Sequence, residues 1–107
     1  MFGYGRDRPY GRDTYRDIER KMAELEDFDG NSMWGRDRSN GYEVFSYATC
    51  IAILDYDSNT LYYNEQDYSV TTSHHQHLVR RYLEHRSKYI VDCNGDRETQ
   101  RAWREGV

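Results

Sequence analysis

The sequence predicts a small α+β domain, in which helices pack on a mainly antiparallel sheet of three to four strands behind a flexible N-terminal tail. Three observations carry this prediction. Residues 43–54 alternate with the period of two that is typical of a strand. Residues 14–27, and a second segment that starts at Thr72 or Ser73, carry apolar residues at helical spacing. Between them, Asp57-Ser58-Asn59 has the composition of a turn that closes a hairpin.

Length and composition indicate a single domain. The 107 residues suffice for one compact core without disulfides or a metal. Only 36% of the residues are hydrophobic and 11 residues are tyrosines, so we expect a small, aromatic-rich core. We divide the chain into a flexible tail (1–13), a helix with a charged loop (14–40) and an α+β core (41–107).

The charge of the chain limits its partners and its location. A formal net charge of −4 argues against binding to duplex DNA, which needs a basic surface. No apolar run approaches the length of about 18 residues that a membrane span requires, and no signal-peptide pattern is present. We therefore expect a cytosolic protein that does not bind membranes.

The N-terminal tail repeats a short polar unit. Tyr-Gly-Arg-Asp occurs at 4–7 and again at 10–13, and the variant Trp-Gly-Arg-Asp occurs at 34–37. Glycine beside alternating opposite charges disfavours regular structure, so the first two copies predict a flexible tail and the third a linker loop over 35–41. Adjacent Arg and Tyr side chains could also stack on bases or on the aromatic residues of a partner.

The first helix is expected over residues 14–27. Thr14 and Asp17 have the spacing of a capping box, which satisfies free amides at a helix start. An apolar stripe at helical spacing would face the core, and three large residues after the helix should fold back onto it. The stripe consists of Tyr15, Ile18, Met22 and Leu25, and the three residues are Phe28, Met33 and Trp34.

The sheet is expected to contain Glu43–Leu54 as one long central strand, Thr60–Asn64 as its hairpin partner, and two short strands at Tyr68–Val70 and Tyr89–Asp92. Cys50 lies within the central strand, which indicates a small buried thiol.

The second cysteine, Cys93, could bridge to Cys50 only if their strands are neighbours, and a cytosolic location argues against that bridge.

The second helix should start with Ser73 and Gln76 as a capping box. Its buried face would carry His75, Leu78, Val79, Tyr82 and Leu83, and its solvent face would carry His74, His77, Arg81 and His85. After the turn Asn94-Gly95, a last short helix would start at Asp96 and end at Gly106, with Trp103 packed inward.

No residue pattern predicts catalysis or a bound cofactor. His74 and His77 are one helical turn apart, but a structural zinc ion needs two more ligands and neither cysteine is suitably spaced. His85 is roughly 12 Å further along the helix, too far for the same ion. Cys50 lies between small strand residues, where a cysteine is more often inert than nucleophilic. We therefore predict a non-enzymatic protein without metal or cofactor.

A surface for a macromolecular partner remains as the main prediction. No Lys or Arg occurs between Gly41 and Val79, whereas six tyrosines and five acids do. Tyrosine is enriched at interfaces, and an acidic aromatic surface suits a basic partner. The predicted partner-binding residues are Tyr47, Asp55, Tyr56, Asp57, Tyr62, Glu65 and Asp67. The alternative is an RNA- or single-strand-binding surface formed by His74, His77, Arg81 and His85.

Two runs resemble a small domain of tailed phages. The runs are Tyr-Glu-Val-Phe-Ser-Tyr-Ala-Thr-Cys-Ile-Ala (42–52) and Tyr-Ser-Val-Thr-Thr-Ser-His-His-Gln (68–76), and the resemblance extends over about 42–83. It implies a phage origin and no particular activity. In size, charge and lack of a catalytic pattern the chain also resembles phage anti-defence proteins of the anti-CRISPR class. We therefore expect a phage accessory protein that acts in the host cytoplasm, where it binds and inhibits a host protein or ribonucleoprotein complex.

Overall fold

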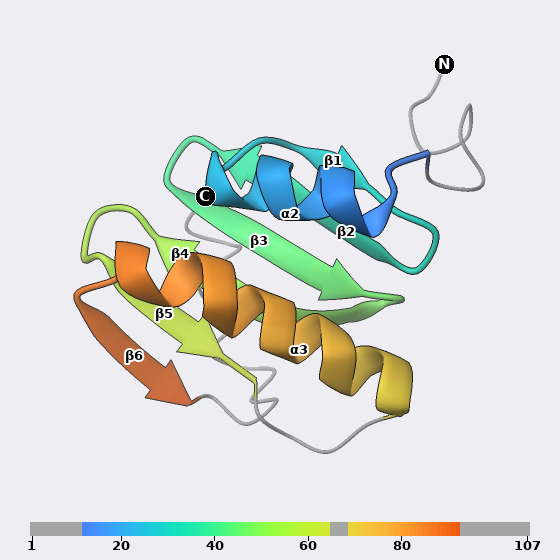
Figure 1. Cartoon of the computed structure of the whole chain (residues 1–107). Helices are drawn as coiled ribbons and strands as arrows, with labels where there is room; N and C mark the ends of the chain where they lie inside the picture. Colours follow the sequence, from blue (N-terminus) through green and yellow to red (C-terminus); the bar gives the residue numbers. More distant parts are fainter. Residues whose placement is uncertain (1–11, 65–68, 93–107) are drawn as a thin grey trace.

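The structure is a computed structural model that describes residues 12–64 and 69–92. Two α-helices, one short 3-10 helix and six strands make up this part of the chain (Figure 1). In chain order these are α2 (Tyr15–Ala23), β1 (Phe28–Asp29), β2 (Met33–Arg38), β3 (Gly41–Ser46), β4 (Thr49–Asp55), β5 (Thr60–Tyr63), α3 (Val70–Leu83), η1 (Glu84–Arg86) and β6 (Tyr89–Asp92).

The strands form one sheet in the order β1-β2-β3-β4-β5-β6. Strands β1 to β5 are antiparallel neighbours, and β6 pairs in parallel with β5 after the chain has passed through α3. Both helices lie on the same face of the sheet (Figure 1). The predicted α+β class is confirmed, but the sheet has six strands and not three to four.

The predicted long strand over 43–54 is wrong, because a tight turn at Tyr47 and Ala48 divides it into the hairpin β3–β4. Tyr47 has a φ of 55°, in the left-handed region that favours glycine, and its amide donates to the carbonyl of Ser32 (2.8 Å). The two turn residues continue the alternation of the flanking strands, so periodicity alone could not reveal the turn. Ile51 is an extra residue in the register and forms a β-bulge.

The predicted linker over 35–41 is also wrong, since residues 33–38 form strand β2. Gly35 is required there for close packing and not for flexibility. A Cβ atom on Gly35 would lie 2.3 Å from Cε2 of the buried Phe28 ring. Beside it, Arg36 pairs with Asp29 (2.9 Å) and lies over the Trp34 ring at 5.1 Å from its centroid. These contacts explain why a charged, glycine-containing segment forms a strand.

Hydrophobic residues pack on both faces of the sheet. The main core lies beneath the helices and contains Ile18, Met22, Phe28, Met33, Tyr42, Val44, Ile51, Ala52, Leu54, Leu61, Tyr63, Leu78, Val79 and Leu83. A smaller cluster on the second face contains Phe45, Cys50 and Ile53, with Trp34 and Tyr62 packed against it. The Trp34 and Phe45 rings are stacked at 4.1 Å. The predicted burial of Cys50 is confirmed, while Cys93 lies outside the described residues.

Helix α2 begins as predicted. Thr14 is the N-cap, and its side chain and that of Asp17 form the reciprocal bonds of a capping box. Ile18 and Met22 are buried and Leu25 packs against them, so three residues of the predicted stripe reach the core. The helix ends at Ala23, earlier than expected, and Leu25 then adopts a φ of 57°.

Helix α3 begins earlier than predicted, at Val70, and this overturns two expectations. Ser69, not Ser73, is the N-cap, and its side chain accepts a bond from the Thr72 amide (3.2 Å). Val70 is helical and does not belong to a strand over 68–70. The β-branched run Val-Thr-Thr favours a strand locally, but Thr72 is buried and bonds to Ser46 on the sheet, and this tertiary contact outweighs propensity.

The predicted faces of α3 are confirmed. His75, Leu78, Val79 and Leu83 are buried and Tyr82 is partly buried. No helix in the described ranges is long and apolar enough to cross a membrane. The last helix predicted from Asp96 and most of the predicted tail lie outside the described residues.

Replacing Ser69 with alanine should lower the free energy of unfolding by about 1 kcal/mol, because the Thr72 amide loses its capping acceptor. Ser73→Ala is the matched control, since Ser73 lies inside the helix and alanine is a good helix former. Urea unfolding monitored by circular dichroism measures both. An equal or larger loss in the Ser73 variant would contradict this assignment of the helix start.

Candidate functional site

The structure places the predicted partner-binding residues at three different locations. Residues 55–57 lie together at the end of β4 and in the turn that follows it. Tyr47 lies at the opposite end of β4, a strand of seven residues that spans roughly 20 Å. Tyr62 packs on the sheet face that the helices do not cover. Glu65 and Asp67 lie outside the described residues. The predicted set therefore does not form one continuous surface.

Residues 55–57 are instead connected by hydrogen bonds to acidic residues of two segments that are distant in the sequence. Tyr56 donates from its hydroxyl to Oδ1 of Asp37 on β2 (2.6 Å). The Asp37 amide in turn donates to Oδ1 of Asp27, which precedes β1 (2.7 Å). Asp57 donates from its amide to Oδ1 of Asp55 (3.0 Å). We call Asp27, Asp37, Asp55, Tyr56 and Asp57 the acidic end of the molecule.

The acidic end has a cation nearby, Arg86, which opposes the rise in the pKa of Tyr56. Within the described part of the chain, no ion pair involves any of its four aspartates, and Asp27, Asp37 and Asp57 are exposed. Arg38 is close by in sequence, but it pairs with the buried Glu43 (2.9 Å). Four negative charges are thus held on a small surface that favours a cationic partner.

Burial and neighbouring acids raise the pKa values of several groups in this region. A side-chain hydrogen bond with Glu24 raises the pKa of the exposed Glu26, which follows α2. Burial, followed by the bond to Asp37, raises the pKa of Tyr56. Tyr42 lies beneath, where burial also raises its pKa, and its hydroxyl donates to the Glu26 carbonyl (2.7 Å). Both phenols therefore stay protonated and act as fixed donors that hold the acidic segments in place.

Carboxylates arranged in this way can accept hydrogen bonds from ammonium or guanidinium groups. Such charge-assisted bonds are shorter and stronger than bonds between neutral groups. Asp37 and residues 55–57 come from neighbouring hairpins, whose strands are fixed by the sheet, so the acidic end needs little ordering on binding. Within 12–64 and 69–92, no three His, Cys, Asp or Glu side chains are grouped to hold a metal ion.

A second polar cluster surrounds His75, which is fully buried. Its Nδ1 lies 2.7 Å from Oγ of Ser46, and Ser46 also bonds to Thr72 (3.0 Å). Its Nε2 lies 3.0 Å from the hydroxyl of Tyr15 and 3.5 Å from Oγ of Ser32. Burial, with a smaller effect from His74, lowers the pKa of His75 to about 4, so the imidazole is neutral near pH 7.

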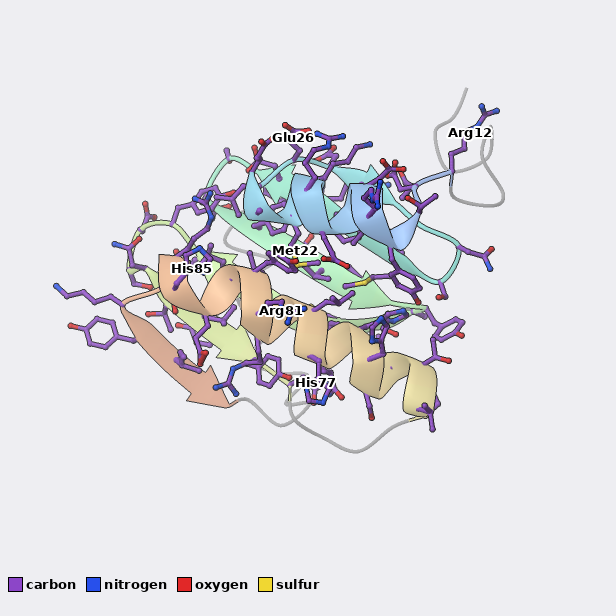
Figure 2. The ribbon with its side chains drawn as sticks, viewed as in Figure 1. Arg12, Met22, Glu26, His77, Arg81 and His85 are labelled. Atoms are coloured by element: carbon purple, nitrogen blue, oxygen red, sulfur yellow. The ribbon has the colours of Figure 1, made fainter. Side chains whose placement is uncertain are left out.

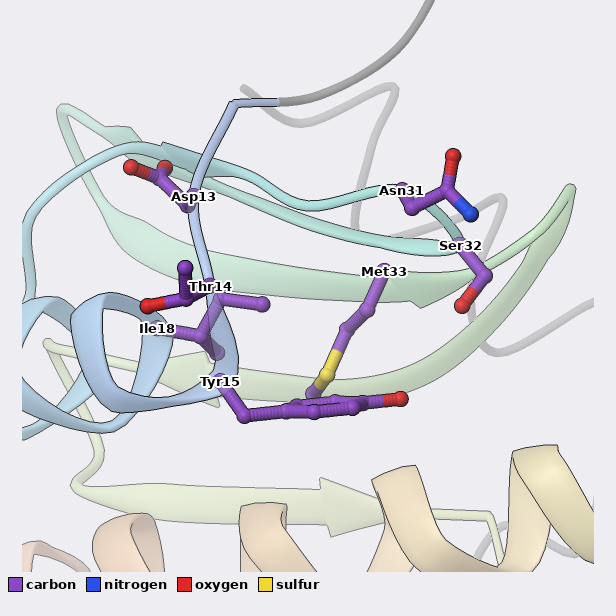
Figure 3. A pocket seen from close by; sticks show the side chains of 7 residues that line it. All are labelled: Asp13, Thr14, Tyr15, Ile18, Asn31, Ser32 and Met33. Atoms are coloured by element: carbon purple, nitrogen blue, oxygen red, sulfur yellow. The ribbon is translucent and has the colours of Figure 1, made fainter.

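The cluster is next to a pocket of about 340 Å³ between the start of α2 and the chain that leads into β2. Its lining consists of Asp13, Thr14, Tyr15, Ile18, Asn31, Ser32 and Met33 (Figure 3). The Tyr15 ring crosses one side of the pocket, and the Met33 side chain points toward it (Figure 3). Of the polar groups here, Tyr15 and Ser32 are bonded to His75, and Asp13 is bonded to Lys21 and to the Asp29 amide.

Ser46 and His75 have the contact distance of a nucleophile and its base. Ser46, however, is only 1% exposed and is also bonded to Thr72, so a substrate cannot reach its hydroxyl in this conformation. We interpret the cluster as a structural link between helices and sheet. The helical spacing predicted that His75 is buried, but it could not predict the partners of His75, because Ser46 and Tyr15 are distant from it in the sequence.

The residues of the alternative nucleic-acid site do share a surface. His74, His77 and Arg81 on α3 and His85 on η1 are all exposed, as predicted for this solvent face. Figure 2 shows His77, Arg81 and His85 following one another along α3 and η1. The adjacent Arg80 is bonded to Glu84 (2.6 Å), which reduces the positive charge beside them.

A family model described as a family of unknown function, DUF8033, matches residues 17–103, which is more than half of the chain. The chain belongs to this family. In this DUF8033 domain the match begins within α2 and includes the acidic end and His75 with Ser46 and Thr72, whereas Tyr15 lies before it. No curated protein and no solved structure gives a significant match to the chain.

The burial of neutral His75 in the DUF8033 domain predicts a pH dependence of stability. The unfolded chain should bind a proton on His75 below about pH 6.5, whereas the folded protein should not do so until about pH 4. The free energy of unfolding should therefore be unaffected above about pH 6.5. It should fall as the pH decreases from there to about pH 4, with a loss on the order of 3 kcal/mol.

Chemical denaturation at several pH values measures this loss. In a His75→Gln variant the part of the loss that comes from the imidazole should disappear, while the exposed-site control His77→Gln should keep the wild-type profile. A wild-type protein whose pH profile coincides with that of His75→Gln would show that His75 does not titrate in this way.

Proposed function

We propose that this protein is a non-enzymatic phage accessory protein that binds a basic surface of a host protein through its acidic end and blocks that surface. The observation that carries the proposal is the assembly of four aspartates and one tyrosine from three separate segments, without ion pairs among the described residues. Complementary charge provides specificity and a fast association rate at such interfaces.

The phage origin and the host target rest on the sequence. The runs over 42–52 and 68–76 resemble a tailed-phage domain, and small acidic phage proteins of the anti-CRISPR class act by occupying host complexes. A defence complex that handles nucleic acid has basic grooves, and a surface of fixed carboxylates could occupy such a groove in place of the phosphate backbone.

The partner should be lost when the acidic end is neutralised. We expect immobilised wild-type protein to capture one host protein from bacterial lysate in stoichiometric amounts. The Asp55→Asn/Asp57→Asn variant keeps the amide-to-side-chain bond of the turn, since asparagine retains the acceptor oxygen. It should bind the captured protein about tenfold more weakly at about 50 mM salt, and the difference should shrink at about 500 mM.

Glu19→Gln is the control for the single variant Asp57→Asn, because each removes one negative charge. Glu19 lies on α2 and accepts a bond from Tyr82 of α3, which glutamine can still accept. The affinity of Glu19→Gln for the captured protein should equal that of the wild type. Capture of no host protein by folded wild-type protein, or equal retention by the acidic-end variant, would reject the proposal.

A second candidate function, binding of RNA or single-stranded nucleic acid, is favoured by the exposed row on α3. Arg81 and the three histidines could contact phosphates. Fluorescence polarisation with short RNA and DNA should then show binding that weakens in salt. Arg81→Gln should reduce it, and flat titrations would remove this alternative.

A further inference from the structure

The edge of the sheet at β6 exposes apolar residues on both sides of the strand. Tyr89 is 56% exposed, Ile90 42% and Val91 43%. Successive residues of a strand point to opposite faces, so neither face of β6 is covered well. In the strand order β6 comes last, and no described strand lies beyond it.

Such an edge usually carries protection against pairing with another chain. Proteins place charges, proline or a bulge on edge strands, or keep them very short. The opposite edge follows this rule, since β1 has only two residues and one of them is Asp29. Strand β6 has four residues, and its centre has neither charge nor proline.

The backbone at the centre of β6 is oriented to accept another strand. The Tyr89 amide donates to the Asn59 carbonyl, so Tyr89 directs its backbone groups toward β5. Backbone groups alternate in direction along a strand, and Ile90 therefore directs its N–H and C=O away from β5. These two groups have the orientation that a new antiparallel partner requires.

We propose that β6 pairs antiparallel with β6 of a second copy of this chain, about a two-fold axis at Ile90. This register places Tyr89 opposite Val91 of the other copy, and the symmetry repeats that pair at the other end. An aromatic and a β-branched residue form a favourable cross-strand pair. The sequence Tyr-Ile-Val is thus complementary to itself in this register.

The dimer should be weak. A four-residue strand is short, and we expect it to bury less than the roughly 1,200 Å² that stable interfaces require. Dimers should therefore form at concentrations on the order of 100 μM. This proposal goes beyond the proposed function, because it needs no host partner and uses residues outside the acidic end.

Sedimentation velocity with the purified full chain, at concentrations between about 5 and about 500 μM, tests the proposal. The weight-average mass of the wild type should rise toward twice that of the monomer. Tyr89→Glu/Val91→Glu should keep the protein monomeric, since it places glutamates opposite each other, and Tyr89→Glu/Val91→Lys should restore the dimer, since it places a glutamate opposite a lysine at each end.

Circular dichroism spectra and Tm values of the three proteins provide the folding control. Wild-type protein that stays monomeric at every concentration overturns the proposal. The same holds if Tyr89→Glu/Val91→Glu dimerises as well as the wild type, or if Tyr89→Glu/Val91→Lys, although folded, stays monomeric.

Discussion

The imidazole of His75 is held at the place where α2, α3, β3 and the chain before β2 meet. It bonds through Nδ1 to Ser46 and through Nε2 to Tyr15, so one neutral ring ties both helices to the sheet. A charged ring could not be buried there without a large desolvation cost. The position of α3 over the sheet depends on this contact and on the apolar residues of α3, because the helix itself starts with β-branched residues that favour strands.

The helices and the sheet hold the acidic end from below. Tyr42 is buried beneath it and bonds to the chain just after α2, while the pairing of β2, β3 and β4 fixes Asp37 on β2 and residues 55–57 at the end of β4. Three of the four carboxylates are therefore held by hairpins of the sheet, and Asp27 lies in the segment that precedes β1. A surface of this kind loses little conformational entropy on binding, which favours recognition by charge and shape over induced folding.

Local signals predicted some elements well. The capping box at Thr14, the turn before β5 and the buried face around His75 depend on residues that are near in sequence. Other features depend on contacts between distant segments. Gly35 can lie within strand β2 because the Phe28 ring packs on it. The turn at Tyr47 is fixed by a hydrogen bond from the Tyr47 amide to the Ser32 carbonyl.

The same distinction applies to the candidate site. Residues 55–57 stood out as an acidic turn with a tyrosine, but Asp27 and Asp37 could not be assigned to it from the sequence, because the strand pairing that brings them there was not predicted.

The parallel pairing of β6 has a consequence for how the chain folds. Strands β1 to β5 follow one another as an antiparallel meander, so their contacts are local and can form early. Strand β6 can join β5 only after α3 has crossed the sheet and closed a much longer loop. It should therefore be the last strand to form and the first to detach, and its amides should exchange with solvent deuterium through local opening well before those of β3 and β4.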